Sequence, residues 1–314
     1  MNFVIFLFWS LGFCHLAQSI SDGMETNAVG VDASILKKEE ENKMVSFFSV
    51  EDASNHFGNV NAPFDSRHLE TCEAVQLGQD LDGEAAGDIG LVNLLRCLPI
   101  FGYSVALSSD GNTFAVGGRL NDGNGVNAGH ARVFHWNGNA WAQMGNDLDG
   151  EAAHDWFGYS VALSSDGHIL AVGGYYNDGN GDNAGHARVF HWNGNAWAQM
   201  GNDLDGEAAG DYFGWRFGKS VALSSDGKTF AVGGLANDGN GFDAGHARVF
   251  HWNGNAWAQR GNDLDGEAAG DWFGTSVALS SDGNTFAVGG ILNDGNGNNA
   301  GHARVFDWNG NAWA

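Results

Sequence analysis

Carboxylates gather in one short motif that recurs along the chain, and they are the side chains best suited to chemistry. Each copy reads Asp-x-Asp-Gly-Glu and is followed four residues later by a further Asp. Carboxylates two residues apart, with a Gly that lets the backbone curl, suit a hard cation that takes oxygen ligands. We therefore predict calcium as the candidate metal, at Asp147, Asp149, Glu151, Asp155, Asp203, Asp205, Glu207, Asp211, Asp263, Asp265, Glu267 and Asp271.

These acids also have a second interpretation. They could be solvated turn residues whose charge keeps the protein soluble. A variant first copy consists of Asp80, Asp82, Glu84 and Asp88. Because the motif lacks the full Asp-x-Asp-x-Asp-Gly register of a calcium loop, both interpretations stay open.

A second loop, Asp178-Gly179-Asn180-Gly181-Asp182, places oxygen side chains at alternate positions. Its last position is Val126, Asp182, Phe242 and Asn298 in the four copies. Only the second copy, and at most the fourth, has the donors to complete a cation site. This loop is therefore the weaker metal candidate.

Histidine and arginine recur two residues apart, and their repetition resembles a ring of ligands. The pairs are His130 with Arg132, His186 with Arg188, His246 with Arg248 and His302 with Arg304. A buried guanidinium needs a carboxylate partner, so we predict structural salt bridges to loop Asp residues. On the opposite strand face, we predict packed or hydrogen-bonded neutral imidazoles for His135, His191 and His251.

Catalysis needs an acid, a base and a nucleophile within mutual reach, and a nearly fourfold chain offers little such asymmetry. No Gly-x-Ser-x-Gly elbow, P-loop or zinc pair occurs in the sequence. The polar departures from the repeat fall at different phases of it: His154, His168, Arg119, Arg216, Lys219, Lys228, Arg260 and Asp307. We therefore predict a protein that is not an enzyme.

The composition excludes several other classes. With 38 acidic and 14 basic residues the formal charge is -24, so the chain cannot neutralise many phosphates and nucleic acid is a poor partner. The apolar fraction of 43% is too high for a disordered chain. The 49 glycines follow no collagen period.

An internal repeat of about 56 residues determines the predicted fold. It is marked by Phe-Gly and Ser-Val-Ala-Leu at Phe101, Phe157, Phe217 and Phe273. We predict four strands per repeat, exemplified by 160–163, 170–172, 187–192 and 196–198. The last two form a tight hairpin, in which a type II′ turn would place Trp192 opposite Trp197 and a type I′ turn would place Phe190 there.

A four-stranded antiparallel sheet of this size cannot bury both apolar faces alone, so consecutive sheets must pack face to face. The sequence therefore predicts an all-β fold, a β-propeller of four-stranded antiparallel blades, over residues 74–314. An open solenoid is the less favoured alternative.

The repeat resembles the FG-GAP repeat through Phe157-Gly158, Ala171-Val172-Gly173-Gly174 and Gly185-His186-Ala187-Arg188-Val189-Phe190. That family builds propellers, including the integrin α-chain head. Gly-Gly replaces the family's Gly-Ala-Pro, and Gly-Gly with the later Trp is also similar to kelch repeats. The integrin-type calcium loop lies between the first two strands, where this chain has only Ser165-Asp166-Gly167-His168, so the resemblance does not supply a metal site.

We predict four blades closed by an N-terminal strand, residues 74–78, that completes the last blade. A truncated ring with more blades is the alternative. Residues 89–100 form an atypical insert that is either a protruding apolar loop or translated non-coding sequence.

The N-terminal residues indicate export. Residues 1–19 carry no charged side chain and end in Ala17-Gln18-Ser19, which is typical of a cleaved signal peptide rather than a membrane anchor. Residues 20–73 are polar, and we predict a mostly disordered leader. Cleavage would leave Cys72 and Cys97, hence at most one intrachain disulfide and no transmembrane segment.

We therefore expect a secreted or cell-surface binding or adhesion propeller that recognises an extracellular protein or glycan, with an acidic face that could hold calcium. A propeller hydrolase or lyase acting on extracellular polysaccharide is one alternative. A purely structural acidic matrix protein is the other.

Overall fold

The computed structural model describes residues 76–83, 101–207 and 217–314. The chain divides into two compact units, Met1–Leu77 and Gly78–Ala314, and the architecture below is that of the second. The predicted signal peptide, leader and insert lie outside the described residues, as do Glu84, Asp88 and Asp211. No helix in the described ranges is long and apolar enough to cross a membrane.

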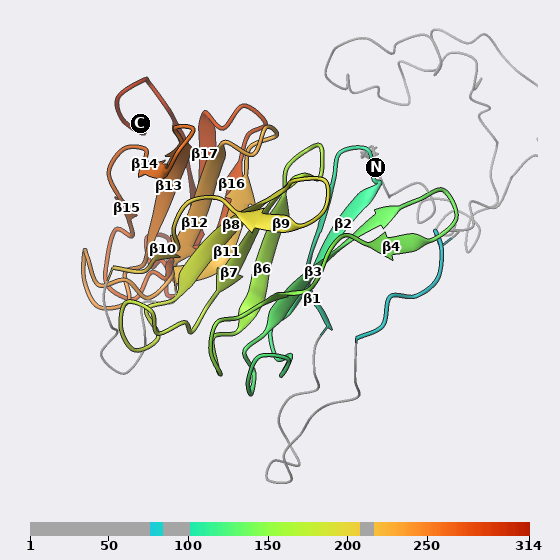
Figure 1. Ribbon diagram of the computed structural model, residues 1–314. Helices are drawn as coiled ribbons and strands as arrows, with labels where there is room; N and C mark the ends of the chain where they lie inside the picture. The colour runs from blue at the N-terminus through green and yellow to red at the C-terminus, as the bar shows by residue number, and fades with distance from the viewer. Residues whose placement is uncertain (1–75, 84–100, 208–216) are drawn as a thin grey trace, which may run out of the picture. The chain divides into compact units, whose positions relative to one another are not determined.

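The described residues form four antiparallel sheets that follow one another in chain order (Figure 1). The first contains β1 (Phe101–Leu107), β2 (Thr113–Gly118), β3 (His130–Trp136), β4 (Trp141–Gln143) and β5 (Leu148–Asp149). The second contains β6 (Phe157–Leu163), β7 (Ile169–Gly174), β8 (His186–Trp192), β9 (Trp197–Gln199) and β10 (Leu204–Asp205). The third contains β11 (Phe217–Leu223), β12 (Thr229–Gly234), β13 (His246–Trp252), β14 (Trp257–Gln259) and β15 (Leu264–Asp265). The fourth contains β16 (Phe273–Leu279), β17 (Thr285–Gly290) and β18 (His302–Asp307).

The predicted four strands are present in each of the first three sheets, together with a fifth that was not predicted. The short strands β5, β10 and β15 come from the acidic motif and pair back onto β3, β8 and β13. In the fourth sheet, a bridge between Trp308 and Trp313 takes the place of the last hairpin strand. The all-β fold of propeller blades is confirmed.

The tight hairpin follows the type II′ register. Trp192 lies opposite Trp197, and their ring centroids are 5.5 Å apart. Gly194 has a φ of 95°, which the first central position of this turn requires. The side chain of Asn193 accepts hydrogen bonds from the N–H groups of Asn195 and Ala196. The alternative register, with Phe190 opposite Trp197, is therefore excluded.

Hydrophobic clusters form between sheets rather than within one. Val133 of the first sheet and Val161 and Leu170 of the second belong to one buried cluster. The first strands β1, β6, β11 and β16 pack on one another in a row. Each sheet is thus stabilised by its neighbour, as its small size requires.

The Phe-Gly step holds neighbouring sheets together. Gly158 has a φ of 83°, and a Cβ atom there would clash with the carbonyl oxygen of His130 in the preceding sheet. The Gly158 carbonyl in turn accepts a 2.9 Å hydrogen bond from the hydroxyl of Ser104. Ser160 and Ser220 bond in the same way to Gly218 and Gly274. Glycine and serine are therefore needed where the first strands meet.

The first and last sheets each leave one apolar face exposed. Val105 is 60% exposed, whereas its counterpart Val161 is 9% exposed. Val305 in the last sheet is 66% exposed, whereas Val249 is 1% exposed. The predicted closing strand is not among the described strands. Gly78 instead lies against the Trp pair of the first sheet, as Gly145 lies against that of the second.

Candidate site at the junctions between sheets

The acidic motif brings carboxylates to the recurring His and Arg side chains. Pairing of β3 with β5 places Asp149 opposite His130. Arg132 Nε lies 3.3 Å from Asp147 Oδ1, and His130 Nδ1 lies 3.4 Å from Asp147 Oδ2. Gln143 accepts from Arg132 and donates to Asp147 at 2.6 Å. The third sheet repeats this arrangement with His246, Arg248, Gln259 and Asp263.

In the second and fourth sheets the acid comes from the preceding linker. Arg188 Nη1 lies 3.6 Å from Glu151 Oε1, and its Nη2 donates to the Asp149 carbonyl at 2.6 Å. Arg304 lies 3.9 Å from Glu267 in the same manner. The predicted structural salt bridges are confirmed, with Glu as well as Asp as the acid.

Burial keeps three of the recurring imidazoles neutral, those of His130, His186 and His246. It lowers the pKa of His186 to about 3, with a smaller contribution from Arg188. Burial likewise lowers the pKa of His246 to about 4, against the opposing effect of Asp263. The pKa of His130 is lowered for the same reason. These side chains are therefore uncharged at neutral pH.

The carboxylates at the junctions are crowded. Burial raises the pKa of Glu151 more than Arg188 lowers it, and the Asp203 carboxylate adds to the rise. Burial also raises the pKa of Glu207, and neighbouring Asp263 raises it further. The pKa values of Asp205 and Asp265 are raised by burial and by Asp203 and Asp263. These carboxylates therefore take up a proton at a higher pH than ordinary exposed acids.

The predicted calcium residues are divided among different positions instead of forming one site per linker. Asp155 is buried, and its carboxylate accepts the N–H groups of Glu151 and Ala152. Asp271 does the same for Glu267 and Ala268, and also accepts from Asn293. These two residues shape their loops.

Six of the other predicted acids meet in groups that include a histidine. Donor atoms within 4.8 Å of one another come from His130, Asp147 and Asp149; from Glu151, His186 and Asp203; and from Glu207, His246 and Asp263. The second and third groups combine acids from two successive linkers. Sequence reasoning assigned the histidines no ligand role, although their fixed spacing from Arg was visible.

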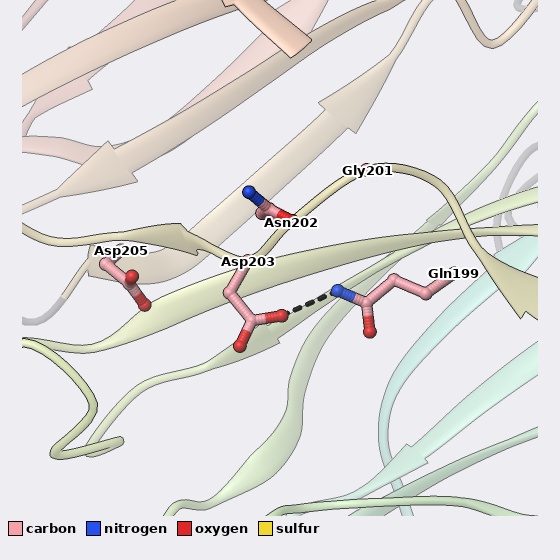
Figure 2. A pocket seen from close by; sticks show the side chains of 5 residues that line it. All are labelled: Gln199, Gly201, Asn202, Asp203 and Asp205. Atoms are coloured by element: carbon pink, nitrogen blue, oxygen red, sulfur yellow. Dashed lines mark hydrogen bonds between the residues drawn. The ribbon is translucent and has the colours of Figure 1, made fainter. Parts of the chain in front are cut away.

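A shallow depression lies beside the second group. It is lined by Gln199, Gly201, Asn202, Asp203 and Asp205. Gln199 donates a 2.6 Å hydrogen bond to Asp203, which Figure 2 marks with a dashed line. An acidic surface is therefore accessible next to the buried His186.

The second predicted metal loop uses its polar side chains to hold itself together. Asn180 donates to the Gly206 carbonyl at 2.7 Å, and Asp178 accepts from the Asn183 N–H at 2.6 Å. Asn177 accepts from the Gly179 N–H. These hydrogen bonds hold the loop in its conformation and join it to the linker that follows the sheet.

The prediction that His135, His191 and His251 are packed is wrong, because all three are exposed. His135 Nδ1 lies 3.2 Å from the Thr113 hydroxyl, and His251 Nδ1 lies 3.4 Å from that of Thr229. They lie near the end of the strand face on which Val133, Val189 and Val249 are buried, and the predicted hydrogen bonding is confirmed for His135 and His251.

Comparisons with known proteins identify the repeat. The family described as FG-GAP repeat matches residues 148–190 and 264–306. The described sheets are thus propeller blades, and the matched segments are FG-GAP repeats.

No curated protein sequence matches the chain. One solved structure that is similar to it is a putative 6-phosphogluconolactonase from Bacteroides uniformis. The identity is 14% and the TM-score 0.47, with 68% of this chain and 55% of that chain covered. The chain thus spans about half the length of that protein.

Proposed function

We propose that this protein is an extracellular, non-enzymatic binding or adhesion propeller. The observation that carries the proposal is the repetition, at three successive sheets, of a junction in which two carboxylates lie close to a histidine. A row of equivalent groups can engage a partner at several points, which multiplies weak individual affinities. The FG-GAP repeats support this class, since propellers of that kind often serve adhesion.

The partner is an extracellular protein or a glycan. A formal charge of -24 disfavours nucleic acid, because phosphate neutralisation supplies most of its non-specific affinity. The acidic surface favours a partner that carries cationic groups, or one that is joined to it by a divalent cation.

Calcium would bind at the crowded carboxylate pairs, Glu151 with Asp203 and Glu207 with Asp263. The donor oxygens suit a hard cation, and the pKa values of Glu151 and Glu207 are raised by burial first and then by the neighbouring carboxylates of Asp203 and Asp263. Arg188 and Arg248 already offset part of the negative charge of these carboxylates. We therefore expect calcium to bind weakly, with a Kd in the millimolar range.

The calcium part is tested by titration calorimetry and by thermal melting. At about ten times the Kd, each site stabilises the fold by about 1.4 kcal/mol. We expect the double variant Glu151→Gln with Asp203→Asn to lose one site, whereas Asp182→Asn, which removes an exposed acid outside the junctions, should not. Absence of both binding heat and a rise in Tm at millimolar calcium would remove calcium from the proposal.

The binding part is tested by incubating the full-length protein with a panel of extracellular polysaccharides and immobilised matrix proteins. We expect at least one of them to be retained, with no release of reducing ends. Reproducible turnover of a polysaccharide would contradict the proposal and make the protein a propeller hydrolase or lyase. Failure to retain any member of the panel would point to a purely structural matrix role.

A further inference from the structure

Two cations and several aromatic rings meet near the start of the first strands of the first three sheets. The aromatic–cation patch consists of Tyr103, Arg119, Trp156, Tyr159, Tyr175 and Lys219. It lies where the repeats differ most. The position of Tyr103 is occupied in the other repeats by Tyr159, Lys219 and Thr275. The position of Arg119 is occupied there by Tyr175, Leu235 and Ile291. A repeated scaffold thus carries one surface that is not repeated.

The rings of the patch form a continuous series. The centroids of Tyr103 and Tyr159 are 4.9 Å apart, and those of Tyr159 and Tyr175 are 4.4 Å apart with nearly parallel planes. Trp156 lies parallel to Tyr159 at 6.3 Å. Tyr103 is 37% exposed, so the series reaches the surface.

Both cations are held on these rings. The Arg119 guanidinium carbon lies 4.3 Å from the Tyr103 centroid and 4.5 Å from that of Trp156. Lys219 Nζ lies 4.6 Å from the Tyr159 centroid and donates a 2.7 Å hydrogen bond to its hydroxyl. The aromatic contacts fix the position of each charge.

Arg119 differs from the junction arginines in its partners. Arg132, Arg188, Arg248 and Arg304 each pair with a carboxylate. Within the described ranges, the Arg119 side chain makes no ion pair or hydrogen bond, and its Nε is buried without an acceptor. Its ring contacts occupy the guanidinium faces and leave N–H edges that suit a carboxylate or a sulfate.

We propose that the aromatic–cation patch binds a saccharide that carries an anionic group, a carboxylate or a sulfate. The C–H face of a sugar ring can pack on an exposed tyrosine ring, whose face carries partial negative charge. The anionic group would bind Arg119, with Lys219 nearby on the same row of first strands. Because the net charge of the whole molecule would repel a long polyanion, and this repulsion is screened beyond about 8 Å at physiological salt, we expect short acidic saccharides to bind best.

This inference rests on the proposed binding function and names one class of ligand for it. The probes are a hyaluronan tetrasaccharide, which carries carboxylates alone, a heparin tetrasaccharide, which also carries sulfates, and neutral cellotetraose. Affinity is measured with the full-length protein by calorimetry and by the fluorescence change of tryptophan. We expect at least one acidic tetrasaccharide to bind more tightly than cellotetraose.

The variants are chosen from the residues of sister repeats so that the fold is kept. Arg119→Leu copies Leu235, Lys219→Thr copies Thr275, and the control Arg260→Met copies Met144 and Met200 at a cation outside the patch. We expect Arg119→Leu to weaken binding of the acidic probe about tenfold or more, since a charge-assisted hydrogen bond is lost. Lys219→Thr should weaken it less, and Arg260→Met should leave it unchanged.

An unchanged affinity in Arg119→Leu, or no binding of either acidic tetrasaccharide, would overturn this inference. Retention of a matrix protein would then still support the proposed binding function. Cleavage of a probe would instead contradict the proposed function itself. The preferred acidic probe distinguishes a carboxylate from a sulfate as the recognised group.

Discussion

At the scale of single residues, the junction at the second sheet combines a buried neutral imidazole with a buried guanidinium. The His186 ring lies edge-to-face against Phe157, with its centroid at 5.7 Å, and the Arg188 guanidinium carbon lies 4.2 Å from the centroid of the same phenylalanine. Glu151 neutralises the guanidinium, and the imidazole stays uncharged because burial lowers its pKa. Protonation of His186 therefore destabilises the folded junction.

A pH-dependent loss of stability follows from this arrangement. The unfolded chain takes up a proton on His186 near its ordinary pKa of 6.5, whereas the folded chain does so only at about 3. The stabilisation is therefore complete above the unfolded pKa and is lost as the pH falls, by about 1.4 kcal/mol per pH unit for each such histidine. The free energy of unfolding, measured with urea between about pH 7 and about pH 5.5, should fall accordingly.

In the variant His186→Phe, the free energy of unfolding should fall less steeply over this pH interval. The control His191→Phe changes an exposed imidazole of the same strand, and its pH dependence should match that of the unmodified protein. Equal slopes in His186→Phe and the unmodified protein would show that the imidazole takes up a proton in the folded state. Glu151 and Glu207, whose pKa values are raised in the folded protein, instead add stability as the pH falls toward the range in which carboxyl groups take up protons. The measured interval therefore ends above that range.

At the scale of elements, the Phe-Gly step acts between sheets rather than within its own strand. Gly102 and Gly158 occupy the same heptapeptide, Phe-Gly-Tyr-Ser-Val-Ala-Leu, and have φ values of 84° and 83°. A Cβ atom at Gly158 would meet the His130 carbonyl of the preceding sheet, whereas a Cβ atom at Gly102 would meet nothing within 4 Å. Both glycines therefore have the same backbone conformation, but only Gly158 is in close contact with the neighbouring sheet.

The single variants Gly102→Ala and Gly158→Ala measure the contribution of this inter-sheet contact. Each substitution carries the cost of a left-handed backbone, about 1–2 kcal/mol. Gly158→Ala should lose a further ~2 kcal/mol or more in the free energy of unfolding, because the sheets must separate to admit the methyl group. Equal losses in urea denaturation would show that the step does not hold the sheets together.

The strands could be predicted from the sequence because apolar alternation and glycine-rich turns recur in every copy. The two-residue strand Leu148–Asp149 could not, because it is too short to carry a pattern. An acidic partner for Arg188 could be predicted because burying an unpaired guanidinium is energetically costly. That this partner is Glu151 could not, because it depends on where the linker from the neighbouring sheet lies. The sequence does not relate Arg119 to Lys219, since only the packing of the first strands brings them to one patch.

At the scale of the whole Gly78–Ala314 unit, stability comes from stacking nearly identical sheets in order. Val249 packs in a cluster with Phe273 and Phe286 of the following sheet, whereas its counterpart Val305 belongs to the last sheet and is exposed. The same side chain in the same sequence context is therefore covered in one sheet and open in another. The difference between them measures what a neighbouring sheet contributes.

The most direct test compares Val249→Ala with Val305→Ala by urea denaturation. We predict a loss of about 2 kcal/mol in the free energy of unfolding for Val249→Ala, because a fully buried side chain is truncated. For Val305→Ala we predict a loss of less than about 0.5 kcal/mol, as for other exposed positions. A small loss at Val249, or an equally large loss at Val305, would contradict the ordered stack of sheets with an open last face.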